Sequence, residues 1–419
     1  MLKLYNFLYN LLAVPLINIL GLFSQKIEAG KKEKFGNYGF KFLNRTIWIH
    51  AVSVGEVMLA QTLINNMHFK NDIVLTTSTP QGQELAKNKL SDKCKVITYF
   101  PYDTTKAIKN AVKAINPEMV IIVETEIWPN FAHIMKELAI PLFIINGRIS
   151  ERTFKSYKRL SFFFKNVLKN YSAILAQTNE DAKRFVEIGA AENKVVVSGN
   201  IKFDIEKPDN YIKHKYRLLF KALNEKVMIF ASTHPDENKL LIETYVKLKD
   251  DFEDLKLIIA PRHLENVESV ENILNSKSIL SGKKSADASF DKCDAIILDT
   301  TGELSNIYSI CDVCVICGSF DKTGGHNPLE ATIWGKPVIS GPNIKNFRYI
   351  YKNLTEQGCA IIVKSTEELK DKVAEFLSDE KYIERISTNC TNAIEKNSGA
   401  TDFTINYIEK FNREQYENN

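Results

Sequence analysis

The sequence predicts an α/β protein built from two doubly wound, Rossmann-like domains that face each other across a cleft. Three observations predict this fold class. The 419 residues are too many for one ordinary core. Short apolar runs alternate with amphipathic segments along both halves of the chain, which is the pattern of repeated βαβ units. The runs are continuous and rich in β-branched residues, as in parallel strands that are buried on both faces.

The composition narrows the class of protein. With 44% hydrophobic and 25% charged residues, the chain is neither disordered nor a low-complexity scaffold. Its formal net charge of +4 is too small to indicate a nucleic-acid partner. The seven cysteines are odd in number and scattered, which favours a reducing compartment over a disulfide framework.

The chain opens with an uncharged stretch from Leu4 to Gln25 that is about long enough to cross a bilayer as a helix. Three asparagines fall on one side of such a helix and a proline interrupts its middle: Asn6, Asn10, Asn18 and Pro15. That pattern also suits a helix lying in the membrane surface. Lysines follow the stretch, and basic residues stay on the cytoplasmic side. We therefore expect residues 1–25 to anchor the protein to a membrane from its cytoplasmic face; a core helix and a cleaved signal peptide are the alternatives.

Seven apolar runs in the first half predict strands at residues 47–52, 72–77, 95–100, 119–125, 141–147, 173–178 and 194–199. Six runs in the second half predict strands at residues 227–233, 255–261, 295–300, 313–319, 336–342 and 359–363. The charged segment between the two sets lacks a strand. We therefore predict one domain over residues 26–205, a linker over 206–226, and a second domain over 227–419 that includes the C-terminal helices.

Three junctions that follow predicted strands or a Gly-rich stretch share one spacing, a polar residue with glutamate three positions later. They run from Ser53 to Glu56, from Thr300 to Glu303 and from Asn327 to Glu330. In one interpretation each glutamate only bonds a backbone N–H, as in a capping box. In the other, the free N–H groups of a helix N-terminus receive a phosphate, and both can hold at once. Pro328 suits a first helical position, and Gly324 and Gly325 would let the backbone approach a ligand closely.

Charged side chains end several predicted strands. Glu124 and Glu126 end the run at 119–125, where the two-residue period of a strand places them on the same side. They are either paired surface charges or a carboxylate pair that projects into the cleft. Arg148, Lys202 and Arg262 also follow strands directly, and three cations at strand ends suit an anionic ligand.

Metal chemistry has no support in the sequence. Cys311, Cys314 and Cys317 have the spacing of a metal site, but the last two lie within a predicted strand, where their odd separation sends them to opposite faces. No complementary Cys or His pair stands at ligand spacing elsewhere, so we interpret them as buried core residues. There is no Walker loop, no GxGxxG after a strand and no GxSxG elbow. We expect no metal and no other cofactor.

Ten segments of the chain match motifs of a known family in the same order: HAVSVGE, TTSTPQGQ, PYD, ETEIWPN, NGRIS, SGNIKFD, PRH, TGEL, GGHNPLE and GKPVISGP. From the anchor to about residue 355 the chain resembles the 3-deoxy-D-manno-octulosonic acid (Kdo) transferases of Gram-negative lipopolysaccharide synthesis. The resemblance implies a GT-B glycosyltransferase attached to the inner membrane, with CMP-Kdo as sugar donor and the lipid A precursor lipid IVA as acceptor. Two departures, NGRIS where NARLS is frequent and the Cys-rich CDVCVICGS, touch no proposed reacting group.

The resemblance also implies roles for single residues. Glu56 corresponds to the catalytic base, and Glu126 and Lys202 to residues that act on the transition state. The CMP-binding residues would be Pro261, Arg262, Thr301, Gly302, Glu303, Asn327, Pro328, Leu329 and Glu330. Further candidates are Ser53, Gly55, Glu124 and Arg148 for the acceptor or the cleft, and Gly324, Gly325 and His326 for a Gly-rich loop.

The expected chemistry is inverting sugar transfer. Glu56 would take a proton from an acceptor hydroxyl, which attacks the anomeric carbon of Kdo as CMP leaves. A carboxylate with an ordinary pKa of about 4 is ionised at pH 7, so no special tuning is expected. Helix N-termini, Lys202 and Arg262 would balance the phosphate charge. Arg148 and the lysines behind the anchor would meet the phosphates of lipid IVA. The alternatives are a transferase or epimerase that uses a UDP-sugar, since many donors share this frame, and a non-catalytic membrane-tethered scaffold.

Overall fold

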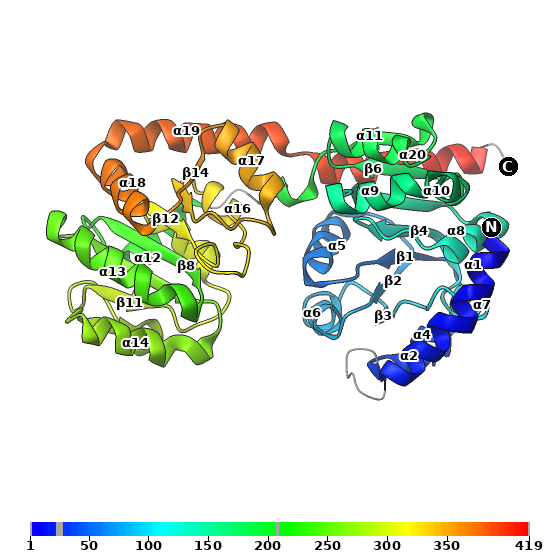
Figure 1. Cartoon of the computed structure of the whole chain (residues 1–419), viewed down its shortest axis with the longest axis horizontal. Coiled ribbons are helices and arrows are strands. Elements are labelled where there is room, and N and C mark those ends of the chain that lie inside the picture. Colours follow the sequence, from blue (N-terminus) through cyan, green and yellow to red (C-terminus); the bar gives the residue numbers. More distant parts are fainter. Residues whose placement is uncertain (1, 22–27, 207–208, 418–419) are drawn as a thin grey trace. The chain divides into compact units, whose positions relative to one another are not determined.

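The structure is a computed structural model that describes residues 2–21, 28–206 and 209–417. Met1 and residues 22–25 of the predicted anchor, and residues 207–208 of the predicted linker, lie outside the described residues. The chain forms two units, Met1–Asp204 with Ser398–Asn419, and Ile205–Asn397. Each unit holds one seven-stranded parallel sheet flanked by helices (Figure 1), which confirms the predicted α/β class and the two Rossmann-like domains.

All seven strands predicted for the first unit are present. They are β1 (Thr46–His50), β2 (Asp72–Thr77), β3 (Val96–Tyr99), β4 (Pro117–Val123), β5 (Leu142–Gly147), β6 (Ala173–Ala176) and β7 (Val195–Val197). The order in the sheet is β3-β2-β1-β4-β5-β6-β7. The order reverses between β1 and β4, and ligands of such sheets bind beyond the carboxyl ends of the strands at this switch point.

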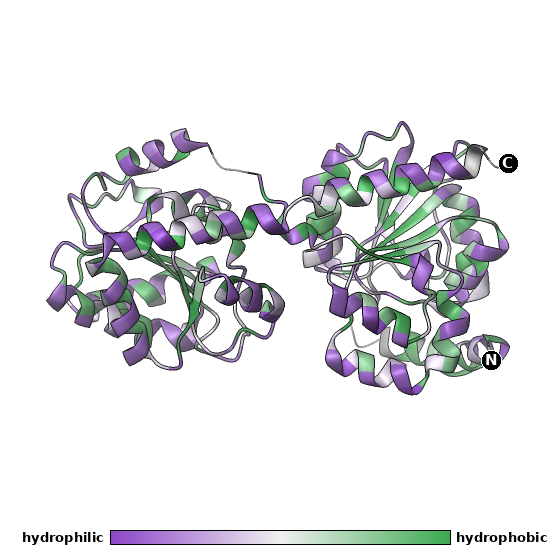
Figure 2. Ribbon diagram, turned by 90° about the horizontal axis from the view of Figure 1, so that it is seen from above, coloured by the Kyte–Doolittle hydropathy of each residue, from purple (hydrophilic) through white to green (hydrophobic). Residues whose placement is uncertain are grey.

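Alternation along the strands builds a core on each face of the first sheet. Ile47 and Ile49 pack into a cluster with the apolar sides of α5 (Val54–Asn66) and α6 (Pro80–Leu90). Trp48 points to the opposite cluster, where its ring meets Phe131 edge-on at 5.2 Å. The helices on that face are α7 (Thr105–Ile115), α8 (Pro129–Glu137), α10 (Ser161–Leu168) and α11 (Asn179–Glu187), with α9 (Glu151–Arg159) before α10. Figure 2 shows the hydrophobic residues concentrated in the strands, as burial of a strand on both faces requires.

The second unit has the sheet order β10-β11-β9-β8-β12-β13-β14. Its strands are β8 (Val227–Thr233), β9 (Lys256–Pro261), β10 (Ser281–Lys283), β11 (Ala295–Ile297), β12 (Val313–Ile316), β13 (Val338–Ser340) and β14 (Ala360–Ile362). Six of these were predicted. The sequence missed β10 because this edge strand has no apolar run. The switch point lies between β8 and β12.

The helices of the second unit are α12 (Asn210–Leu219), α13 (Pro235–Asp251), α14 (Val267–Ser276), α15 (Leu304–Ile307), α16 (Leu329–Thr332), α17 (Arg348–Glu356), α18 (Thr366–Ser378) and α19 (Glu380–Asn397). Helix α12 lies within the segment predicted as a linker. Its residue Tyr216 and the following Phe220 are buried, and Phe220 contacts Phe290. The segment is therefore part of the second unit. The sequence did not show this, because charged residues interrupt the apolar residues of the helix.

The predicted assignment of all C-terminal helices to the second domain is wrong for the last one, α20 (Ala400–Glu417). Ala400, Ile405 and Ile408 are buried in the core of the first unit. The carboxylate of Asp204 accepts hydrogen bonds from the backbone N–H groups of Gly399 and Thr401, which begin this helix. The core on the α5 side of the first sheet is therefore completed by a segment from the far end of the chain.

Residues 2–21, which include the described part of the uncharged stretch, form α1 (Leu2–Leu8), a π-helical turn (Tyr9–Ala13) and α2 (Val14–Gly21). The wider turn, in which the N–H of Val14 bonds to the carbonyl of Tyr9, comes just before Pro15, which has no N–H to donate. Among the residues that the structure describes, no helix has both the length and the apolar character needed to cross a membrane.

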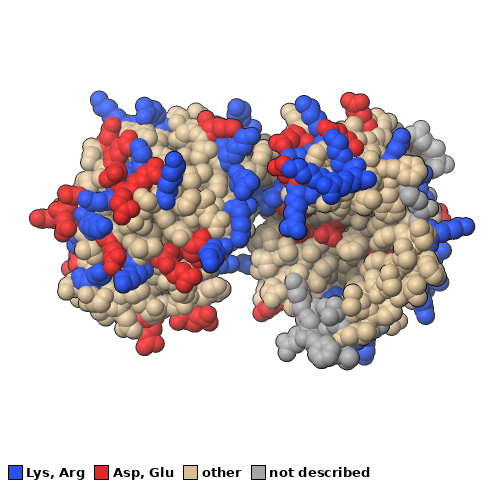
Figure 3. Space-filling view, in the orientation of Figure 1, with Lys and Arg blue, Asp and Glu red and all other residues tan. Residues whose placement is uncertain are grey.

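The polar side of α1 faces the protein and its apolar side faces outward, the reverse of a core helix. The Tyr5 hydroxyl donates to Asp103 Oδ2 at 2.9 Å, and Asn130 Nδ2 donates to Asn6 Oδ1 at 3.1 Å. The exposed side chains are Leu4, Phe7, Leu8, Leu11, Leu12, Leu16 and Ile19. In the same unit, α9 exposes the cations Arg152, Lys155, Lys158 and Arg159, and Lys and Arg side chains gather over this helix in Figure 3.

Candidate functional site

The junction between β1 and α5 holds Glu56 at the switch point of the first sheet. Its carboxylate accepts a hydrogen bond from the backbone N–H of Val52 at 2.6 Å and one from the Ser53 hydroxyl at 3.3 Å. Glu56 therefore does bond a backbone N–H, but not that of the N-cap Ser53, whose side chain makes no capping bond of its own. Gly55 is exposed, and a Cβ built on it would meet no atom within 4 Å. The backbone around Glu56 is open to a ligand.

The loop after β4 brings two more carboxylates to the same junction. The strand ends at Val123 and Glu124 has a left-handed backbone with φ of 58°, so the two-residue period invoked for this pair does not apply. The Glu124 carboxylate forms an ion pair with Lys202 Nζ at 3.1 Å. Residues held in such sparsely populated backbone conformations cost about 1–3 kcal/mol and cluster at functional sites. The sequence placed Lys202 at this site but did not identify Glu124 as its partner.

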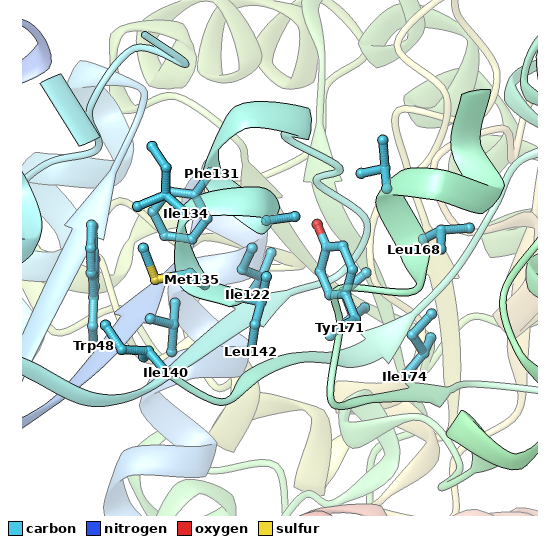
Figure 4. Close-up of a cluster of buried hydrophobic side chains, with 14 of the residues drawn as sticks. Trp48, Ile122, Phe131, Ile134, Met135, Ile140, Leu142, Leu168, Tyr171 and Ile174 are labelled. Carbon is cyan, nitrogen blue, oxygen red and sulfur yellow. The ribbon is translucent and has the colours of Figure 1, made fainter. Parts of the chain in front are cut away.

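A buried hydrophobic cluster packs beside the loop that follows β4. Phe131 and Tyr171 are fully buried in it (Figure 4), and the Tyr171 hydroxyl donates to the backbone carbonyl of Glu126 at 3.4 Å. Thr125 lies between the two glutamates. Its hydroxyl donates to the backbone carbonyl of Arg148 at 2.6 Å and accepts from the backbone N–H of Arg148 at 3.0 Å. The loops after β4 and β5 are thereby tied together, with the Arg148 side chain left exposed. No sequence motif marked Tyr171, which lies far along the chain from the loop it supports.

Two carboxyls at this site, those of Glu56 and Glu126, have raised pKa values. Burial, with further contributions from Glu124 and Glu126, raises the pKa of Glu56 to about 8, although its bonds to Val52 and Ser53 oppose the rise. Burial also raises the pKa of Glu126 to about 7. The expectation that Glu56 is ionised at pH 7 without tuning is therefore wrong: in the free protein its carboxyl is mostly protonated at that pH. A carboxyl that titrates near pH 8 can take up and release a proton close to neutral pH.

The second unit has a cavity of about 350 Å³ at the carboxyl ends of its strands. Five of the residues that line it were predicted from the sequence: Arg262, Gly302, His326, Asn327 and Glu330. The sequence missed the others, which are Ser232, Leu304, Ser305, Tyr308 and Phe347. Ser232 sits at an irregularity of β8 with a left-handed φ of 60°, a device that turns a side chain toward a site.

Arg262 sets the charge of this cavity. It lies directly after β9, its backbone N–H bonds the carbonyl of Thr233 at 2.9 Å, and its side chain is exposed. Burial raises the pKa of Glu330, and the Arg262 guanidinium opposes that rise. Asn327 Oδ1 accepts the N–H of Leu329 at 3.2 Å. The cavity therefore presents a cation, an amide and a carboxyl to a polar ligand.

The remaining predicted residues of this unit are not among those that line the cavity: Pro261, Thr301, Glu303, Pro328, Leu329, Gly324 and Gly325. Glu303 bonds the Thr300 hydroxyl, but it precedes the first helical residue and pairs with Lys284 Nζ at 3.0 Å, so the predicted capping box is absent here. Pro328 stands one position before α16, not at its first residue. Helices α15 and α16 have four residues each, too short for the strong helix terminus expected to receive a phosphate.

Gly324 and Gly325 stabilise the loop in which they lie. Their N–H groups bond the carbonyl of Gly318 at 3.0 and 2.7 Å, and their φ values of 106° and 77° are left-handed. Their backbone N–H groups are thus occupied within the loop, and the expectation that these glycines let a ligand approach the backbone closely stays a prediction. The interpretation of Cys311, Cys314 and Cys317 as buried core residues is confirmed, since all three are fully buried and free.

Comparisons with known proteins show the family of the chain and a likeness of fold. Residues 29–205 match the family model described as 3-deoxy-D-manno-octulosonic-acid transferase (kdotransferase), and residues 219–393 match glycosyl transferases group 1. A 3-deoxy-D-manno-octulosonic acid transferase of Rickettsia bellii is 31% identical over 98% of this chain and 100% of its own length. A bifunctional glycosyltransferase/methyltransferase of Fusobacterium nucleatum is 34% identical over 80% of this chain, which spans 53% of that protein. The crystal structure of a glycosyltransferase from Rickettsia africae, 14% identical, covers 90% of this chain and 100% of its own with a TM-score of 0.57, a likeness of fold alone. The fold is accordingly GT-B-like.

Proposed function

The chain belongs to the 3-deoxy-D-manno-octulosonic acid (Kdo) transferase family, and we propose that it transfers Kdo from CMP-Kdo to the lipid A precursor lipid IVA with inversion. The observation that carries the proposal is the group of three carboxyls and one ammonium at the switch point of the first sheet: Glu56, Glu124, Glu126 and Lys202. Such a group can take a proton and also balance charge, which a non-catalytic scaffold would not need.

Glu56 is the proposed general base. Its carboxylate takes the proton of an acceptor hydroxyl while the oxygen forms a bond to the anomeric carbon of Kdo, and the bond from that carbon to the phosphate oxygen breaks. CMP leaves with the electron pair of the broken bond, and the proton on Glu56 returns to water. Lys202, oriented by Glu124, and the nearby Glu126 are proposed to stabilise the charges that develop during transfer. The proposal involves no metal and no cofactor.

The cavity of the second unit is the proposed site for the nucleotide of the sugar donor. Arg262 supplies a cation for the phosphate, and Asn327 and Glu330 supply polar groups for the rest of the nucleotide. A guanidinium suits this task because it stays charged at every relevant pH and binds phosphate oxygens in a fixed geometry. Gly302, with φ of 82°, lines the cavity, and a Cβ built on it would meet no atom within 4 Å, so its backbone is open to a ligand.

The N-terminal helices are proposed to lie flat on the cytoplasmic face of the inner membrane. Tyr5 and Asn6 tie the polar side of α1 to the protein, so the exposed leucines and Phe7 are directed outward, where an acyl layer would bury them. The cations of α9 belong to the same unit and would be attracted to anionic headgroups. A lipid acceptor requires such an attachment, because its sugar hydroxyls stay at the membrane surface.

The test is direct. Purified protein is incubated with CMP-Kdo and lipid IVA, and the mass of the product is read; we expect lipid IVA to gain Kdo. Glu56→Gln should lose the activity without losing its fold. Transfer at a near wild-type rate by this variant would mean that Glu56 only bonds the backbone at the start of α5. Equal competition by UDP and CMP would contradict the assignment of the sugar donor.

A further inference from the structure

Three histidines of the second unit meet beside the nucleotide cavity. His234 follows β8, His263 follows β9, and His326 lies in the loop after β12. The Nε2 atoms of His234 and His326 are 2.8 Å apart, and the planes of the two rings differ by only 4° with centroids 5.1 Å apart. This combination places the rings end to end, as an N–H···N hydrogen bond requires. The pair lies at the switch point between β8 and β12, and His326 lines the cavity.

A buried carboxylate holds the pair in place. Glu237 has no exposed surface and accepts hydrogen bonds from the backbone N–H groups of His234 at 3.1 Å and Phe320 at 3.2 Å, and from that of Gly318. It joins the start of α13 to the loop after β12. Gly318 forms the floor, since a Cβ there would come within 2.9 Å of the His326 ring and 3.3 Å of the His234 ring. The two histidines therefore meet because two loops are locked together, and not through a chance surface contact.

The contact fixes the protonation of the pair. One hydrogen must lie between the two Nε2 atoms, and two uncharged imidazoles in opposite tautomers satisfy this. Around them, His263 and Arg262 disfavour a positive charge, whereas Asp321 and Asp236 favour it. Burial is the largest influence and lowers the pKa of His326 to about 4 and that of His234 in the same direction. Without a bound anion the pair is therefore uncharged at neutral pH.

We propose that His326 binds the phosphate of the nucleotide and that the histidine pair takes up one proton from water as the phosphate enters. This inference rests on the proposed function, since it names the phosphate of CMP-Kdo as the ligand of the cavity. The hydrogen between the Nε2 atoms stays in place, and the new proton goes to the ring nitrogen that was unprotonated. The resulting imidazolium and Arg262 together face the phosphate, which gains a negative charge when the sugar leaves. On release of CMP the proton returns to water. His234 is a positioning residue in this scheme.

Calorimetry of CMP binding to the full-length protein measures the proposed proton uptake. Titrations at one pH in buffers of different ionisation enthalpy give the number of protons taken up per CMP bound. We expect the wild type to take up more protons than His326→Asn, and the variant to bind CMP roughly tenfold more weakly because a charge-assisted hydrogen bond is lost. The phosphate of CMP titrates near neutral pH itself, and comparison of the two proteins cancels its contribution.

His214→Asn is the matched control, since this histidine is exposed on α12 of the same unit and lines no part of the cavity; its affinity and proton uptake should equal those of the wild type. His234→Asn, which keeps His326 but removes its partner, should also lower the uptake. If the variants do not fold, the wild type still decides: its uptake must exceed the protonation that phosphorus NMR records on the bound CMP.

Equal proton uptake by the wild type and by both pair variants would overturn the inference while leaving the nucleotide site intact. Absence of CMP binding by the wild type would instead contradict the proposed function, so the two failures are distinguishable. Unchanged CMP affinity in a folded His326→Asn protein would also overturn the contact between His326 and the phosphate.

Discussion

Replacing Glu126 by Gln should make Glu56 a stronger acid. Burial of the Glu56 carboxyl, with Glu124 and Glu126 nearby, raises its pKa from 4.5 to about 8. A rise of that size corresponds to ~5 kcal/mol of preference for the uncharged carboxyl. Near pH 8 the Glu126 carboxyl, whose own pKa is about 7, is ionised, so it repels a charge on Glu56. Because burial is the larger cause, we expect removal of this one neighbour to lower the pKa of Glu56 by about 1, or ~1.4 kcal/mol.

The pH dependence of kcat/KM for the acceptor measures this shift, because that ratio reports ionisations of the free enzyme. The wild-type profile should rise with pH to a plateau with a midpoint near 8, since the base must lose its proton. In Glu126→Gln the plateau should be lower and the midpoint should move to more acidic pH by about 1. Glu137→Gln, an exposed glutamate on α8, is the control and should keep the wild-type midpoint. A wild-type profile that is flat between pH 6 and 9, or a midpoint that does not move in Glu126→Gln, would refute the reasoning.

Three other expectations follow from the same geometry. Glu56→Gln should unfold at a higher temperature than the wild type at pH 9 but at nearly the same temperature at pH 5. A carboxyl whose folded-state pKa is raised stabilises the protein below its unfolded-state pKa, and this contribution is lost as the pH rises through about 8. A higher unfolding temperature for the wild type at pH 9 would contradict this. Gly55→Ala should raise the free energy of unfolding by about 0.5–1 kcal/mol, since a Cβ there meets no atom of the protein. It should also lower the transfer rate, because the new methyl group takes up space that is open to the acceptor beside Glu56; denaturant titration measures the first effect and the mass assay the second. Replacing both Leu11 and Leu12 by Ser should weaken binding to anionic vesicles by at least about tenfold in a flotation assay, with an unchanged circular dichroism spectrum. Burial of each exposed leucine in the bilayer would contribute roughly 1.5–3 kcal/mol to the binding free energy. Equal flotation of the variant and the wild type would contradict attachment through this surface.

Local pattern predicted most of the framework. Every strand of the first sheet was visible as a continuous apolar run, since a strand buried on both faces needs apolar residues at successive positions. The edge strand β10 and helix α12 were not visible, because the first has no apolar run and the second shows mainly its charged face. Spacing and strand-end positions singled out Glu56, Lys202 and Arg262, and the resemblance to a known family implied their roles, but neither gave their contacts.

Contacts between distant segments decided the rest. Lys202 pairs with Glu124 across 78 positions of the chain, and His234 meets His326 across 92, so neither pair has a signature in spacing. The buried Glu237 lies in a stretch that no motif marked, although it locks the loops that bring the two histidines together.

The uncharged opening of the chain shows the division between sequence and structure. Its composition by itself indicated an apolar, uncharged segment, and left a membrane anchor, a core helix and a signal peptide as alternatives. Which side of that helix faces the protein was decided only in the tertiary structure, where Asp103 and Asn130 bind its polar side and leave the leucines outward. The acidity of Glu56 has the same origin. A sequence specifies which groups can be buried or charged, but a pKa and an exposed face depend on the segments packed around them, and those come from elsewhere in the chain.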